Sequence, residues 1–134
     1  MAITWILVIS SLFLYNPIYA NVWSCTNSFE SQCSNEECDV KTGEDFTPIG
    51  VSFDDSGAYQ ICAYSGCWEG EGEVNKNGHF LVIFGKNAKW SSPTSAQSTS
   101  VLIGLNTKSN FASVQAGDFV QPIVCKSDNL HKKP

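Results

Sequence analysis

The fold is decided by residues 62–74, which read Cys62-Ala63-Tyr64-Ser65-Gly66-Cys67-Trp68-Glu69-Gly70-Glu71-Gly72-Glu73-Val74. From Trp68 onward, apolar residues or glycines alternate with glutamates. This period of two is typical of a β-strand with one buried and one solvent-facing side. The glycine-containing turn between Cys62 and Cys67 predicts a hairpin clamped by its own disulfide. The segment therefore predicts two antiparallel strands, the second of which carries three carboxylates on its outer side.

Strand patterns continue on both sides of this hairpin. Upstream, residues 47–53 alternate with the same period, and a turn at 54–57 leads into a strand at 59–63. Downstream, Asn77-Gly78 indicates a hairpin turn. Further strands are predicted at residues 80–84, 101–105, 111–116 and 119–125. The first of these runs is apolar on both faces and predicts a central strand, whereas Pro122 indicates an edge or a bulge in the last one.

Two stretches lack a strand pattern. Residues 21–45 are polar and rich in turn formers, and they predict a surface loop tied down by its cysteines. Residues 86–97 predict a long connection with Trp90 anchored in the core. Because no stretch after residue 20 has a sustained helical period, we expect an all-β domain. It is either a small antiparallel barrel or a sandwich, stapled by three disulfides.

The first twenty residues predict a cleaved export signal. Residues 6–14 are apolar apart from two serines, and the stretch closes on the small residue Ala20. No Lys or Arg precedes this run, which is also too short to span a bilayer. Soluble export is favoured over a lipid anchor on Cys25, because Trp23 stands where lipoprotein signals carry a small residue. We expect a signal peptide at 1–20, one β-domain at 21–126 and a disordered tail at 127–134.

Six cysteines in an exported chain of this size predict a disulfide framework, since the exterior is oxidising and small cores need reinforcement. The simplest pairing is Cys25–Cys125, Cys33–Cys38 and Cys62–Cys67. By loop entropy the long bridge contributes about 4.7 kcal/mol and each short one about 2 kcal/mol. Zinc ligation and redox activity are both disfavoured, because the sequence has no CxxC pair and no Cys/His cluster. We expect neither a metal nor a cofactor.

The charge of the chain argues against some partners. The part after residue 20 holds thirteen acidic residues and eight lysines but no arginine, which gives a net charge of −5. Phosphate recognition favours arginine forks and basic faces. Nucleic acid and anionic membranes are therefore poor partners, and we expect no membrane span.

No catalytic set is evident in the sequence. The two histidines are His79, at a strand start, and His131, in the predicted tail, so a triad would lack a base beside its nucleophile. Tyr64-Ser65-Gly66 lacks the first glycine of the G-x-S-x-G nucleophile motif. We therefore predict no catalytic residue, which favours a protein that is not an enzyme.

Two features are candidates for binding. The stripe formed by Glu69, Glu71 and Glu73 could contact a basic partner surface, but the simpler interpretation is a solvated strand face. Trp23, Trp68 and Trp90 are expected to be packing centres, with a ligand cavity as the alternative. The candidate binding residues are Tyr64, Ser65, Gly66, Trp68, Glu69, Glu71 and Glu73.

The segment Cys62–Gly70, with Trp90-Ser91 and the outer cysteines, resembles a group of small exported proteins of alphaproteobacteria that have no assigned activity. The likeness is specific in CAYSGCWEG alone. The resemblance implies an envelope location, periplasmic, and transfers no catalytic or binding residue. Two families of small exported β-barrel inhibitors, of lysozymes and of secreted metalloproteases, share the size and disulfide content, but their recognition motifs are not visible here.

These observations predict a non-catalytic β-domain in the periplasm or outside the cell. We expect it to bind an unknown protein or small ligand of the envelope through rigid loops at 33–38 and 64–66, because preorganised loops lose little entropy on association. Three alternatives remain open. They are an inhibitor of a secreted hydrolase, an enzyme that uses carboxylates such as Glu69 and Glu71, and a purely structural envelope component. The enzyme hypothesis requires those two side chains to converge in a pocket.

Overall fold

The computed structural model describes residues 20–91, 97–117 and 119–128. Within these ranges the chain forms ten β-strands and no helix, which confirms the predicted all-β class. The strands are β1 (Val22–Thr26), β2 (Glu30–Ser34), β3 (Glu37–Lys41), β4 (Gly50–Asp54), β5 (Ala58–Ala63), β6 (Gly66–Asn77), β7 (Phe80–Trp90), β8 (Ser98–Asn106), β9 (Phe111–Ala116) and β10 (Phe119–Asp128). The described part of the chain contains no helix long and apolar enough to cross a membrane.

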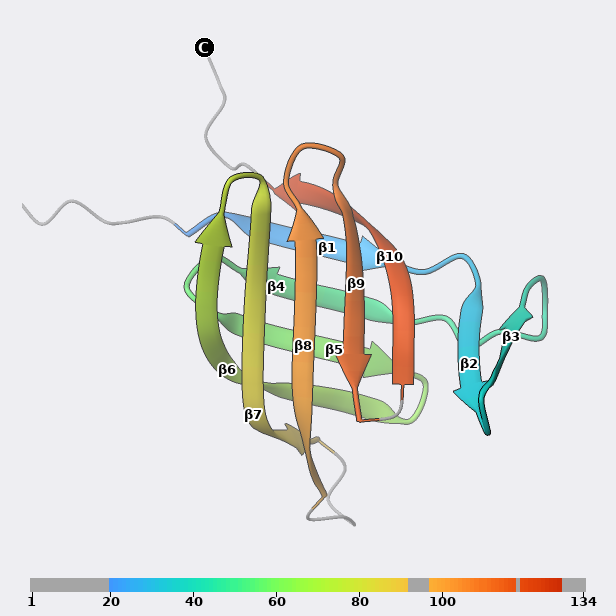
Figure 1. Ribbon diagram of the computed structural model, residues 1–134. Helices are drawn as coiled ribbons and strands as arrows, with labels where there is room; N and C mark the ends of the chain where they lie inside the picture. Colours follow the sequence, from blue (N-terminus) through green and yellow to red (C-terminus); the bar gives the residue numbers. More distant parts are fainter. Residues whose placement is uncertain (1–19, 92–96, 118, 129–134) are drawn as a thin grey trace, which may run out of the picture.

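Eight of the strands close into an antiparallel barrel (Figure 1). Their order is β1-β4-β5-β6-β7-β8-β9-β10, and β1 pairs with β10 to complete the ring. The barrel alternative is therefore confirmed over the sandwich. The remaining strands, β2 and β3, form a hairpin whose one strand pairing with the barrel within the described residues is that of Val120 with Ser31. In Figure 1 this hairpin stands out from the barrel on the right.

The barrel is flattened into two layers whose strands run across one another, with β7, β8 and β9 in front and β1, β4 and β5 behind (Figure 1). The long strands β6 and β10 belong to both layers. β6 bends at a register shift between Glu69 and Gly72. A side chain at Gly72 would lie 2.7 Å from the Ile83 side chain and from the Phe84 carbonyl oxygen, so only glycine permits this close approach.

Inward-facing side chains fill the barrel. Alternate residues of the barrel strands point inside, and the largest side chains among those that are essentially inaccessible to solvent are Leu81, Ile83, Ile103, Leu105, Gln121 and Val114. Trp23 stacks on Phe53 at a ring-centroid distance of 5.6 Å. The interior is thus a packed core, in line with the small diameter of an eight-stranded barrel.

All three predicted disulfides are present, and no cysteine is free. Each joins two residues that lie directly opposite each other on paired strands, with Cα atoms 4.0 Å apart. The Cys25–Cys125 bridge is buried in the seam where β1 closes the barrel against β10. The Cys33–Cys38 bridge is exposed on the β2–β3 hairpin. Three disulfides within one small chain are typical of proteins from oxidising compartments outside the cytosol.

The prediction of a surface loop at residues 21–45 is wrong, because this segment contains β1, β2 and β3. In β1, Trp23 and Cys25 are buried while their neighbours are not, but two inward residues are too few for a recognisable pattern. The β2–β3 hairpin has hardly any apolar residues. Backbone pairing and a disulfide hold it together, and neither of these produces a hydrophobic periodicity from which the strands could be predicted.

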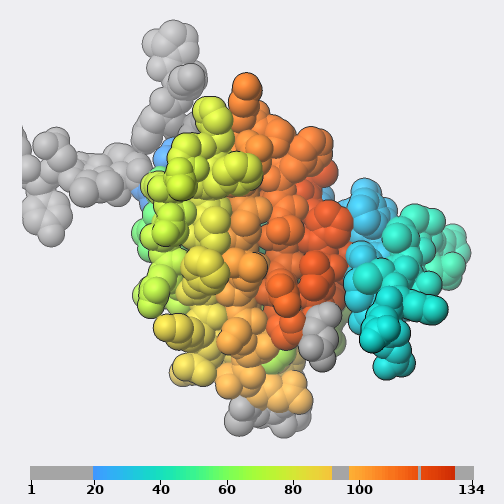
Figure 2. All heavy atoms as spheres, in the orientation of Figure 1, coloured from blue at the N-terminus to red at the C-terminus, as the bar shows by residue number. Residues whose placement is uncertain are grey.

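Three smaller expectations also need correction. The run 80–84 is central, because β7 pairs with β6 on one side and β8 on the other, but it is not buried on both faces: Phe80 is 56% and Phe84 49% exposed. The outer side of β7, β8 and β9 faces the viewer in Figure 2. Residues 86–90 continue β7, and Trp90 is half-buried at a barrel end instead of anchored in the core; residues 92–96 lie outside the described ranges. The turn after β6 is formed by Gly78-His79, because Asn77 pairs with Phe80.

The C-terminal end gives a mixed result. The edge expected at Pro122 is confirmed, because β10 pairs there with β9 alone, between the parts that meet β2 and β1. β10 runs through Asp128 and so extends two residues into the predicted tail. The rest of that tail, including His131, lies outside the described residues.

Candidate functional site: an acidic arm beside an aromatic pocket

The β2–β3 hairpin and the loop after it form what we call the acidic arm, residues 30–45. Six of the thirteen acidic residues and one of the eight lysines lie in it, which gives it a net charge of −5. The rest of the chain has seven of each and is neutral. From Gln32 to Val40 every residue of the arm is exposed. The whole net charge of the protein is therefore concentrated on one projecting element.

The arm has a constrained backbone. Its turn consists of Asn35 and Glu36, both with positive φ angles, of 50° and 70°. Two consecutive residues in this region are typical of the type I′ turn, which matches the twist of a two-stranded hairpin. Cys33 and Cys38 are bridged directly below the turn. The tip of the arm is therefore preorganised although no core supports it.

Side-chain hydrogen bonds fix the base of the arm to the barrel. The amide of Gln121, which is fully buried, accepts from the Ser31 backbone N–H at 3.1 Å and donates to the Ser31 carbonyl at 3.2 Å. The Asn27 side chain donates to the carbonyls of Phe29 and Thr47 and accepts from the Ile49 N–H. These bonds satisfy backbone groups on both sides of the arm, so its orientation is set by the barrel.

An aromatic pocket opens at the barrel end beside this base. Its volume is about 290 Å³, near the lower limit for small-molecule sites. The lining residues are Glu30, Thr47, Ile49, Ile61, Cys62, Ala63, Trp68, Trp90, Ala116 and Phe119. Trp68 and Trp90 lie opposite each other on β6 and β7, with ring centroids 4.9 Å apart and planes tilted by 59°. We call this site the aromatic mouth.

Glu30 belongs to both features. It is the first residue of β2 and one of the residues that line the aromatic mouth. One carboxylate oxygen accepts a hydrogen bond from the Thr47 N–H at 2.9 Å, which holds the side chain in the pocket wall. The mouth therefore combines two indole rings with a fixed negative charge.

The clamped β5–β6 turn supports the mouth from the other side. Gly66 lies against the Trp90 indole, where an added Cβ would be 2.8 Å from the nearest ring carbon. The Cys67 N–H donates to the Ser91 hydroxyl at 2.9 Å, and the Ser91 N–H donates to the Cys67 carbonyl at 2.8 Å. The Cys62–Cys67 bridge thus holds the turn that positions Trp90. The tip of the turn is solvent-facing, with Tyr64 84% exposed.

The predicted binding residues separate into two groups. Trp68 lines the mouth and Gly66 supports its wall, whereas Tyr64 and Ser65 lie in the clamped turn and do not line the mouth. Glu69, Glu71 and Glu73 are instead exposed on the outer side of β6, as the solvated-face interpretation predicts.

The glutamate stripe does not form a catalytic pocket. Glu69 accepts from the Gln60 side chain at 3.2 Å, and Glu73 pairs with Lys86 at 3.6 Å. Glu69 and Glu71 border the same depression of about 450 Å³, but this depression is open to solvent and both side chains are exposed. The convergence that the enzyme hypothesis requires is not observed, and no group of acidic, histidine or cysteine side chains that could hold a metal is found among the described residues.

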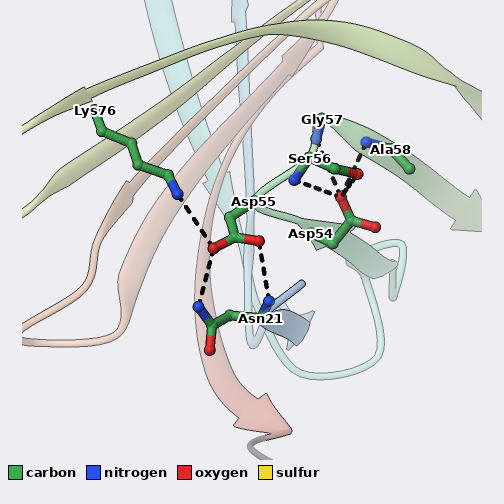
Figure 3. A network of polar contacts seen from close by, with 7 residues as sticks. All are labelled: Asn21, Asp54, Asp55, Ser56, Gly57, Ala58 and Lys76. Carbon is green, nitrogen blue, oxygen red and sulfur yellow. Dashed lines mark hydrogen bonds and ion pairs between the residues drawn. The ribbon is translucent and has the colours of Figure 1, made fainter. Parts of the chain in front are cut away.

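The opposite end of the barrel is closed by polar contacts (Figure 3). Asp55, in the β4–β5 turn, accepts from Lys76 at 3.1 Å and from the backbone and side chain of Asn21 at 3.0 and 2.9 Å. Burial alone would raise the pKa of Asp55, but the hydrogen bonds from Asn21 and Lys76 and the charge of Lys76 outweigh it and lower the pKa below 3.8. Asp54 caps the same turn by accepting from three successive N–H groups, those of residues 56–58.

One buried polar group has no partner within the described residues. The Tyr59 hydroxyl lies inside the barrel without a hydrogen bond, and burial raises its pKa. Because the Tyr59 hydroxyl occupies the space that a Cβ on Gly70 or Gly85 would need, we assign it a packing role.

No protein-family model, no curated protein and no solved structure matches the chain. The site must therefore be interpreted from its own chemistry. One of its two components was readable from the sequence, because six acidic residues within positions 30–45 form a visible charge block. The aromatic mouth could not be predicted from the sequence, because Trp68 and Trp90 are brought together only by the pairing of β6 with β7.

Proposed function

We propose that this protein is an exported, non-catalytic binding domain for a basic protein or peptide. The acidic arm attracts and docks the partner, and the aromatic mouth takes one of its lysine or arginine side chains. The observation that carries this proposal is the location of the entire net charge of −5 on a rigid arm whose base, Glu30, also lines an aromatic pocket.

The charge distribution supports a cationic partner. A projecting element with a net charge of −5 on an otherwise neutral body creates a directed field that accelerates the approach of positive surfaces. Complementary charges at an interface contribute mainly to association rate and specificity. The apolar mouth beside the arm would then supply the desolvated contact that slows dissociation.

The composition of the mouth supports a cationic side chain as its occupant. An ammonium or guanidinium group over a tryptophan face gains about 0.5–2 kcal/mol, more as the pair is desolvated. The Glu30 carboxylate in the same wall would supply a charge-assisted hydrogen bond. A pocket of about 290 Å³ suits one long side chain better than a large ligand.

Preorganisation also favours binding. The arm is held by its own disulfide and by the Gln121 contacts, and the mouth by the Cys62–Cys67 turn. Little conformational entropy remains to be lost on association. Inhibition of a secreted hydrolase with a positively charged cleft would be one form of this function, in which the arm occludes the cleft.

Binding of a defined cationic probe tests the proposal. We expect hexalysine to bind and hexaglutamate not to bind, as measured by calorimetry and tryptophan fluorescence at low and high salt. Glu30→Gln should weaken hexalysine binding by about 5- to 30-fold, the range expected for a charge-assisted contact of 1–2 kcal/mol. The Glu37→Gln/Asp39→Asn double variant should weaken it mainly through a slower, less salt-dependent association.

The glutamate stripe provides a matched control. The Glu71→Gln/Glu73→Gln double variant removes the same amount of charge from β6, away from the arm and the mouth, and should leave binding within a factor of two. Equal losses in the arm and stripe variants would mean that hexalysine responds only to total charge. That result, or binding of hexaglutamate in place of hexalysine, would refute the proposal.

A further inference from the structure

The residue that follows the predicted signal peptide is anchored to the barrel by its own backbone nitrogen. Asn21 N lies 3.0 Å from Asp55 Oδ1, and the Asn21 side-chain amide lies 2.9 Å from Asp55 Oδ2. The Asp55 N–H donates back to the Asn21 carbonyl at 3.1 Å. Figure 3 shows the Asp55 carboxylate held between Asn21 and Lys76. Three hydrogen bonds therefore join one residue to one turn at the position where the sequence predicts cleavage.

We infer that Asp55 is a built-in receptor for the α-ammonium group that forms when the chain is cleaved between Ala20 and Asn21. In the uncleaved chain Asn21 N is a neutral amide with a single hydrogen to donate. In the processed chain the same atom is a cation within hydrogen-bond distance of a carboxylate. Removal of the leader thus converts a neutral hydrogen bond into an ion pair.

The covalent step is hydrolysis by a signal peptidase. Water adds across the Ala20–Asn21 peptide bond, the new carboxylate leaves with Ala20, and the new amine remains on Asn21. That amine takes up a proton at neutral pH, since a free α-amino group has a pKa of about 7.7–8.0. No oxidant, reductant or further reactant is required.

The surroundings suit a cation at Asn21 N. Asp55 Oδ1 receives the Asn21 nitrogen, while Asp55 Oδ2 receives the Asn21 side chain and Lys76 Nζ, so the two positive groups approach different oxygens. Asp54 and Asp128 lie opposite Val22 on the two neighbouring strands, β4 and β10. This end of the barrel therefore presents three carboxylates and one lysine around the new terminus. Charge-assisted hydrogen bonds are roughly twice as strong as neutral ones.

The position of this pair connects processing to closure of the barrel. Asn21 directly precedes β1, the strand that completes the ring by pairing with both β4 and β10. Asp55 belongs to the turn after β4, and Lys76 to the end of β6. The ion pair would strengthen the contacts that already hold the first strand in register, and it would do so only in the mature chain, which is the form that has left the cytosol.

The inference is tested by identifying the first residue of the secreted protein and by measuring the pKa of its α-amino group. The full 134-residue chain is exported from a bacterial host, and the first residue of the secreted product is determined by mass spectrometry. We expect Asn21. The rate at which acetic anhydride labels the α-amino group is then followed against pH. We expect a pKa about one unit above that of a free terminus, because the folded state favours the charged form.

Two variants should abolish this shift. Asp55→Asn removes the carboxylate, and insertion of one glycine before Asn21 moves the ammonium by one residue, about 3.5 Å. Both should return the α-amino pKa to about 7.7–8.0. Asp128→Asn is the matched control, because Asp128 accepts from Ser24 and not from Asn21, and it should keep most of the shift. The glycine insertion keeps the test valid if Asp55→Asn does not fold.

The free energy of unfolding of the mature protein should depend on pH in the way that these two pKa shifts require. A raised α-amino pKa contributes stability that is fully present below about pH 8 and lost as the pH rises through the folded value. The lowered pKa of Asp55 contributes stability that is present above pH 3.8 and lost as the pH falls. A secreted chain that begins elsewhere, a failure of export, or an α-amino group that titrates alike with and without Asp55 would overturn the inference.

Discussion

The barrel and the acidic arm use the same covalent device under opposite physical conditions. In the barrel, Cys25–Cys125 lies among buried apolar side chains and joins strands that are 100 residues apart. In the arm, Cys33–Cys38 is exposed, joins residues five apart and has no core around it. The barrel would keep a core without its bridge, whereas the arm has only its bridge, its turn and the contacts at its base.

This difference shows what each disulfide stabilises. A bridge over a long loop restricts the unfolded chain as a whole, so its effect is seen in global stability. A bridge over a short exposed hairpin mainly selects the conformation of that hairpin. We therefore expect barrel substitutions to alter the free energy of unfolding and arm substitutions to alter binding.

The largest expected effect is the loss of the barrel bridge. Replacing Cys25 and Cys125 by alanine should lower the free energy of unfolding by about 4.7 kcal/mol, as calculated from the entropy of a 100-residue loop. Urea unfolding followed by circular dichroism measures this. The matched Cys33→Ala/Cys38→Ala variant should lower the same quantity by less than the about 2 kcal/mol that loop entropy assigns to a five-residue loop, because the arm can open while the barrel stays folded. Similar losses in both variants would mean that the arm and the barrel unfold as one unit.

A core truncation gives the next largest effect. Ile103 on β8 is fully buried, so Ile103→Ala should cost about 2–5 kcal/mol through lost burial and a residual cavity. Val40→Ala, at a position that is 64% exposed on the arm, should stay within about 0.5 kcal/mol of the natural protein. Thermal unfolding of the two variants side by side checks the contrast, which a destabilised Val40→Ala protein would contradict.

Loosening the base of the arm should have an intermediate effect. Gln121→Met keeps the volume of the side chain but removes both hydrogen bonds to Ser31, at a cost of about 1–2 kcal/mol. We also expect faster amide hydrogen exchange in β2 and β3 and unchanged exchange in β7 and β8. Uniformly faster exchange across all four strands would show that Gln121 supports the core and not the attachment of the arm.

The smallest effect is expected at the arm turn. Glu36 has a φ of 70°, a region that glycine enters without the steric cost of a Cβ. Glu36→Gly should therefore favour the closed hairpin by about 0.5–1 kcal/mol, a 2- to 5-fold shift in the equilibrium between Cys33–Cys38 and its dithiol. Redox titration against glutathione with mass-spectrometric detection measures it. An equilibrium shifted toward the dithiol would argue against strain at this position.

The sequence predicted the barrel strands better than the arm because their physical signals differ. β6 and β8 alternate between core and solvent, so hydrophobic periodicity locates both. β2 and β3 have no buried face, and their pairing depends on a turn and a disulfide. The all-β class and the disulfide pairing are confirmed, whereas the loop expected at residues 21–45 is wrong.

The candidate site was only partly predictable. The turn at residues 64–66 and Trp68 follow from the local sequence around Cys62 and Cys67. The contributions of Glu30 and Trp90 do not, since one comes from β2 and the other from the far end of β7. The regular spacing of the glutamate stripe made it a candidate binding surface, yet its side chains are exposed, and Glu69 and Glu73 contact Gln60 and Lys86.

By itself, the sequence determined the local properties of this protein: which residues alternate, which cysteines are close enough to close short turns, and how much charge the chain carries. Only the tertiary structure decided that the strands close into a barrel instead of a sandwich, that two tryptophans from different strands form one pocket, and that Asn21 meets Asp55. The physical reason is range. Periodicity and turn chemistry act over a few residues, whereas closure, pocket formation and charge placement depend on contacts between residues far apart in the chain.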